Sequence, residues 1–148
     1  MKRCATNRQA LALLALIPAL LLIGCAHNTA VPTPAPIQVA NSVNALAQSL
    51  DAATSGLIAA RDAGKLSQAD LTTSFAVITT LTTAGKQINA ELRSTEGWDV
   101  QRGKVLRVIT GTGLAAISAK LPPNARVIMQ AAVALFNVVS TAVGGPAI

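Results

Sequence analysis

The residues of this chain that could do covalent or acid–base chemistry are two cysteines and one histidine. Cys4 stands among basic residues at the start of the chain, whereas Cys25 and His27 lie close together further on. A catalytic nucleophile needs a base held rigidly beside it, and His27 falls in a Pro-rich stretch where we expect no rigid support. These residues therefore do not predict catalysis, and Cys25 needs another explanation.

The residues before Cys25 have the layout of a signal peptide. Lys2, Arg3 and Arg8 make the start basic, and residues 10–23 follow without a charge. Fourteen helical residues span about 21 Å, which is shorter than a hydrocarbon core of about 30 Å. We therefore predict a signal peptide over residues 1–24 rather than a permanent transmembrane helix.

The apolar stretch ends in Leu22-Ile23-Gly24-Cys25, which resembles the lipobox of bacterial lipoprotein precursors. The resemblance covers residues 1–25. It implies cleavage between Gly24 and Cys25, a diacylglycerol on the Cys25 thiol and an N-acyl lipid such as palmitate on the freed amine. Several acyl chains would anchor the protein to membrane lipid, because each buried methylene contributes about 0.8 kcal/mol. The next residue, Ala26, replaces the Asp of inner-membrane lipoproteins in some Gram-negative bacteria, and this favours the periplasmic face of the outer membrane.

The rest of the chain divides into a tether and a domain. Residues 25–37 hold the lipidated cysteine and three alternating prolines, so we expect an extended tether there. Residues 38–148 are long enough for one domain. Apolar residues make up 51% of the chain and aromatic residues 2%, and such an Ala-rich composition favours helices over strands.

The apolar spacing predicts two helical hairpins in this domain. Helices are expected over about 39–63 and 68–93, with Gly64 ending the first and Ser67-Gln-Ala-Asp70 forming a capping box for the second. The turn between them is short, so the pair should be antiparallel.

A third helix is expected from about Trp98 to Lys120, with Gly111 and Gly113 as its weakest point. Asn124 is the expected cap of a fourth helix that runs to about Val143. That helix is nearly apolar all round, which is typical of a central helix. We therefore predict an all-α bundle of about four helices, arranged as two antiparallel hairpins.

The remaining motifs favour structural interpretations. The six acidic residues are scattered and form no ligand set for a metal. Gly111-Thr-Gly113 lacks the lysine and the strand of a phosphate loop. Gly111, Ala115 and Ala119 instead suggest a small-residue seam packed against the fourth helix, with a dimer seam as the alternative. We predict no enzyme activity, no catalytic residue, no metal and no cofactor besides the lipid on Cys25.

Positive charge is concentrated in residues 97–148, which hold one acidic residue, Asp99, and five basic ones: Arg102, Lys104, Arg107, Lys120 and Arg126. These five could form a patch that contacts anionic head groups, lipopolysaccharide phosphates or peptidoglycan carboxylates. The alternative is an ordinary solvated face. Nucleic acid is disfavoured by the export signal and by the lack of stacking aromatics.

Together these features predict a lipid-anchored, periplasm-facing, non-enzymatic protein with an interaction or structural role in the cell envelope. Its expected partner is an anionic envelope component or an envelope protein. One alternative is a membrane-active accessory lipoprotein, of the phage-lysis or envelope-stress kind, whose C-terminal hairpin engages the bilayer. A second alternative is a carrier that holds an apolar ligand between loosely packed helices.

Overall fold

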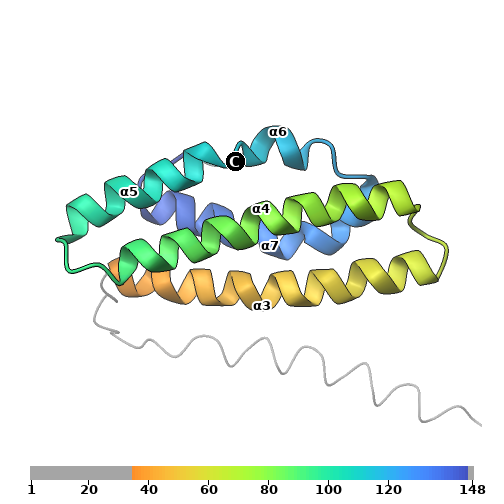
Figure 1. Ribbon diagram of the computed structural model, residues 1–148, viewed down its shortest axis with the longest axis horizontal. Helices are drawn as coiled ribbons and strands as arrows, with labels where there is room; N and C mark the ends of the chain where they lie inside the picture. The colour runs from red at the N-terminus through yellow and green to blue at the C-terminus, as the bar shows by residue number, and fades with distance from the viewer. Residues whose placement is uncertain (1–34, 147–148) are drawn as a thin grey trace, which may run out of the picture. The chain divides into compact units, whose positions relative to one another are not determined.

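The chain folds into a helical bundle in the computed structural model, which describes residues 35–146. The helices are α3 (Ala35–Asp62), α4 (Gln68–Leu92), α5 (Trp98–Gly111), α6 (Leu114–Ser118) and α7 (Pro123–Ala142) (Figure 1). No strand occurs in this part of the chain. The predicted all-α bundle is therefore confirmed.

The first hairpin follows the sequence signals closely. Gly64 has a φ of +68°, and its amide donates to the Arg61 carbonyl while the Lys65 amide donates to Ala60, so the end of α3 is closed by backbone bonds. The Ser67 hydroxyl accepts from the Asp70 amide at 3.1 Å, and the Ser67 amide donates to the Asp70 carboxylate at 3.3 Å. The predicted capping box of α4 is confirmed.

The start of α3 differs from the prediction. The helix begins at Ala35, three residues before the expected domain boundary at 38. Pro36 lies in the first turn of the helix. Backbone N–H groups there have no acceptor within the helix, so the N–H that proline lacks costs no hydrogen bond. Residues 35–37 are therefore helical rather than part of an extended tether.

The third predicted helix is two helices. Gly113 adopts a φ of +59°, which interrupts the helix between α5 and α6. The predicted weak point is thus correct, but the predicted continuity is wrong. The predicted packing of Gly111, Ala115 and Ala119 as one seam against the fourth helix is wrong too, because the break separates Gly111 from the other two and all three are exposed. Their alternative role in a dimer stays a prediction.

Asn124 does not cap α7. The helix begins one residue earlier at Pro123, and no side chain caps it. The Asn124 amide instead donates to the Lys65 carbonyl at 2.9 Å. This bond links the α3–α4 turn to the α6–α7 turn, which are distant in sequence.

The core consists of aliphatic side chains together with Phe136 and Met129 from α7. The apolar residues that recur at helical spacing along α3 are buried: Val39, Val43, Leu46, Leu50 and Leu57. The α3 helix packs chiefly against α7 and α4, whereas α5 and α6 pack against α4. The α7 helix therefore pairs mainly with α3 and not, as the predicted second hairpin required, with the α5–α6 segment. Because α4 contacts each of the others, it is the central helix, and α7 keeps one exposed face.

The long helices alternate in direction, with α6 continuing the direction of α5, so the turns between antiparallel helices collect at two ends of the bundle (Figure 1). The α4–α5 end holds the first turns of α3 and α5 together with the end of α7. The α3–α4 end holds the α3–α4 turn and the α6–α7 turn, joined by the Asn124–Lys65 bond. These two names are used below.

Candidate functional site: a basic bundle end beside an apolar groove

The five cations predicted to form one patch are divided between regions of the bundle. Arg102 and Lys104 lie in the first turns of α5, at the α4–α5 end, while Lys120 and Arg126 flank the α6–α7 turn at the opposite end. The eighteen residue steps from 102 to 120 would span about 27 Å as a helix. A single patch of all five is therefore not what the fold produces.

Lys104 is occupied by ion pairs within the protein. Its ammonium lies 2.6 Å from the Glu96 carboxylate and 3.5 Å from that of Glu91. The hydrogen bond to Glu96 raises the pKa of Lys104 above its ordinary value, with help from the charge of Glu91. This cation is thus already neutralised and has a structural use at the α4–α5 turn.

Arg102 has a structural use as well. Its Nε donates to the Val143 carbonyl at 2.8 Å, which satisfies a backbone acceptor at the end of α7. The guanidinium lies against Gly144, whose φ is +76°, and a Cβ there would collide with it. The two cations at the α4–α5 end therefore hold helix ends together.

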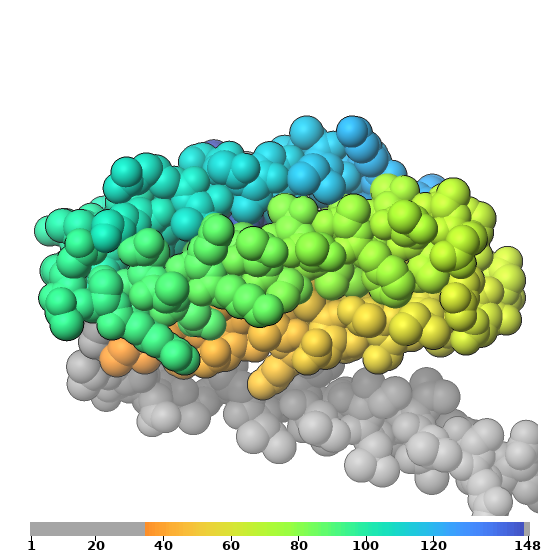
Figure 2. All heavy atoms as spheres, in the orientation of Figure 1, coloured from red at the N-terminus to blue at the C-terminus, as the bar shows by residue number. Residues whose placement is uncertain are grey.

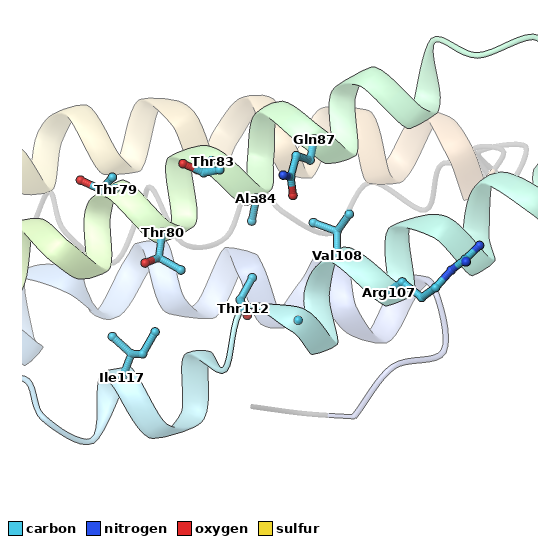
Figure 3. A pocket seen from close by; sticks show the side chains of 10 residues that line it. Thr79, Thr80, Thr83, Ala84, Gln87, Arg107, Val108, Thr112 and Ile117 are labelled. Carbon is cyan, nitrogen blue, oxygen red and sulfur yellow. The ribbon is translucent and has the colours of Figure 1, made fainter.

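Arg107 borders a shallow groove between α4 and the α5–α6 segment, on the face shown in Figure 2. The groove has a volume of about 610 Å³. Figure 3 shows Thr79, Thr80 and Thr83 of α4 on one side and Arg107 at one edge. The hydroxyls of Thr79 and Thr80 bond to carbonyls of their own helix, so they offer little free donor capacity to a ligand.

A third basic residue, which the sequence analysis did not select, lies at the same end as Lys120 and Arg126. Lys65, in the α3–α4 turn, lies at the same end because Asn124 bonds to its carbonyl. Arg61 is close by in sequence, but its guanidinium pairs with Asp62 at 2.7 Å. We call Lys65, Lys120 and Arg126 the basic cluster.

The charges of the basic cluster are not compensated within the described residues. Lys65 and Lys120 are exposed and have no ion pair there, and Arg126 donates to the Leu121 carbonyl at 3.2 Å. This end carries two acidic residues, Asp62 and Asp70, and four basic ones: Arg61, Lys65, Lys120 and Arg126. Positive potential therefore collects at the α3–α4 end.

An apolar groove of about 720 Å³ begins beside the cluster, between α6 and α7. Arg126 borders it, and its walls are mostly aliphatic: Ala115, Ala119, Leu121, Pro123, Val127 and Val133. Val127 has 73% of its surface exposed, the largest value among the bulky apolar residues described. A groove of this kind could accept an apolar segment whose charged end meets Arg126.

The predicted cleavage and lipidation site at Gly24 and Cys25 lies outside the described residues, as does His27. Within residues 35–146, no three His, Cys, Asp or Glu side chains could share a metal ion. The buried polar side chains there, Ser74, Gln101 and Ser140, each bond to a backbone carbonyl. Helix packing explains these three residues.

The α7 helix is, among the described residues, the one long and apolar enough to cross a membrane. A core helix of a water-soluble domain passes the same test, and about a third of α7 is buried in the bundle. Comparisons with protein-family models, curated proteins and solved structures found no match to this chain. The functional argument therefore rests on its own residues.

Proposed function

We propose that this chain is a lipoprotein precursor whose mature form, anchored through Cys25, is a non-enzymatic interaction protein of the cell envelope. The anchor is supported by the basic start, the uncharged stretch and the Leu22-Ile23-Gly24-Cys25 lipobox. The helical bundle is the part that would meet a partner.

The observation that carries the interaction is the contrast between the two bundle ends. The anchor joins the domain through α3, which starts at the α4–α5 end. The basic cluster lies at the other end of this 28-residue helix, about 42 Å away along its axis. The uncompensated charge therefore lies far from the point where the anchor is attached.

This placement favours an anionic partner other than the anchoring membrane. Among anionic envelope components, the carboxylates of peptidoglycan fit such a surface, because it is held away from the lipid. Basic groups near an anionic surface contribute about 1 kcal/mol each, and salt weakens the attraction. The expected interaction is therefore modest, reversible and sensitive to ionic strength.

Co-sedimentation of the acylated protein with isolated peptidoglycan sacculi tests this proposal. The double variant Lys65→Glu/Lys120→Glu should bind at least about tenfold more weakly, because it reverses two exposed charges. The matched control Lys86→Glu/Arg93→Glu changes net charge equally, at exposed positions outside the cluster, and should bind almost normally. Equal loss in both variants, or loss in neither, would show that the cluster is not the contact surface.

A membrane-active role of the C-terminal hairpin is the second candidate, favoured by the apolarity of α7 and its exposed Val127 and Val138. Insertion would have to withdraw α7 from the bundle and expose to water the core side chains of α3 that pack against it, at about 1.5–3 kcal/mol for each side chain. A Cys25→Ser protein that partitions into vesicles would support this candidate. A soluble, monomeric Cys25→Ser protein would refute it.

A further inference from the structure

The α4–α5 end of the bundle combines exposed apolar side chains with an aromatic ring. Ile37, in the first turn of α3, has 50% of its surface exposed, and Val100, in the first turn of α5, has 51%. Trp98 begins α5 and is half-buried against the core. Both bulky aliphatic residues would be more stable out of water.

The charges at this end compensate one another. This end carries three acidic residues (Glu91, Glu96 and Asp99) and three basic residues (Arg93, Arg102 and Lys104). Lys104 pairs with both glutamates, and Arg102 bonds to the Val143 carbonyl. The formal charges at this end therefore cancel, so bringing it to a lipid surface would not require anionic lipid.

The chain length between the anchor and the bundle is short. Nine residues lie between Cys25 and Ala35, where α3 begins, and the ten steps from one to the other cover at most about 36 Å in an extended chain. The α4–α5 end is thus the part of the domain that an anchor at Cys25 would hold nearest to the bilayer.

We infer that the α4–α5 end rests on the surface of the bilayer that carries the anchor, with Ile37, Trp98 and Val100 at the level of the lipid head groups. Trp is favoured at this level because its ring is apolar and its N–H can still reach water. This inference rests on the proposed anchor at Cys25. Its consequence is an oriented domain, in which the basic cluster points away from the membrane.

Trp98 is the single tryptophan of the chain and reports on this contact directly. The acylated protein would be reconstituted into phosphatidylcholine vesicles, with and without brominated acyl chains that quench nearby tryptophan. Trp98 should lose most of its fluorescence to the brominated lipid, and its emission should shift to shorter wavelength on reconstitution. The substitution Val100→Ser should reduce both effects.

The matched control moves the tryptophan to the other end of the bundle. In Trp98→Phe/Val127→Trp the new ring takes an exposed position, which needs no space in the core, and it should be quenched little. Two results would contradict the contact of the α4–α5 end with the bilayer while leaving the anchor intact. One is equal quenching at both positions, and the other is an unquenched Trp98 in protein that floats with the vesicles. Protein that carries no acyl group and does not float would overturn the anchor and this contact with it.

Discussion

The α3–α4 hairpin and the segment from α5 to α7 secure their helix ends in different ways. In the α3–α4 hairpin the ends are closed by neighbouring residues, namely Gly64 and the pair of Ser67 and Asp70. In the segment from α5 to α7, Arg102 reaches across to the end of α7, and Asn124 bonds to another turn. Local signals are readable from sequence, and bonds between distant residues are not.

The largest difference in unfolding free energy should appear between removing a buried phenylalanine ring and removing a partly exposed one. Phe136 of α7 is fully buried, whereas Phe75 of α4 is partly exposed. Phe136→Ala should lower the free energy of unfolding by about 3–5 kcal/mol, because it leaves a cavity. Phe75→Ala should cost clearly less. Denaturant unfolding followed by circular dichroism measures both, and equal losses would mean that α7 is not part of the core.

The end of α7 should depend on Arg102 and Gly144 together. Gly144→Ala should cost about 1–2 kcal/mol, because the residue is in the left-handed region and its Cβ would displace Arg102. Gly103→Ala, in open space within α5, should instead stabilise the protein by about 0.5–1 kcal/mol. Thermal unfolding of the two variants would show opposite shifts. A stabilising Gly144→Ala would contradict this account of the α7 end.

The cap of α4 should matter somewhat less. Ser67→Ala removes the acceptor for the Asp70 amide and should lower the unfolding free energy by about 1 kcal/mol. Ser55→Ala, on the exposed face of α3, serves as a control and should stabilise the protein slightly, because Ala has a higher helix propensity than Ser. If the two variants were equally stable, the capping box would contribute nothing.

The same distinction between local bonds and bonds between distant residues explains how much of the fold could be predicted from the sequence. The boundaries of α4 and the glycine end of α3 were predictable, because capping residues stand next to the helices they cap. The break at Gly113 was underestimated, since a glycine costs only about 1 kcal/mol in a helix and packing decides whether the helix continues. The role of Asn124 could not be foreseen, because its partner is Lys65, 59 residues away.

The basic cluster was predicted only in part, and the reason is geometric. Lys120 and Arg126 were identified from charge alone, but Arg102 and Lys104 were grouped with them. In an antiparallel bundle the first and third turns share one end, so Lys65 could have been chosen from the predicted hairpins themselves. The ion pairs of Lys104 could not, because they depend on where the α4–α5 turn brings Glu91 and Glu96.

The smallest expected effect concerns pH. The folded state raises the pKa of Lys104 above 10.5, so its contribution to stability is complete at lower pH and is lost as pH rises through the folded-state pKa. The unfolding free energy should therefore fall slightly more steeply above pH 10.5 in the parent protein than in Lys104→Met. Parallel curves would show that the two ion pairs add no stability, as many exposed pairs do.

The intact mass of the full-length protein expressed in a Gram-negative host, beside its Cys25→Ser variant, tests the proposed anchor most directly. The account predicts a mass equal to residues 25–148 plus acyl groups, and loss of the acyl mass in the variant. An uncleaved or unacylated chain would contradict it. Residues 10–24 would then be an ordinary leader or a membrane segment, and the two bundle ends would no longer be distinguished by their distance from a lipid anchor.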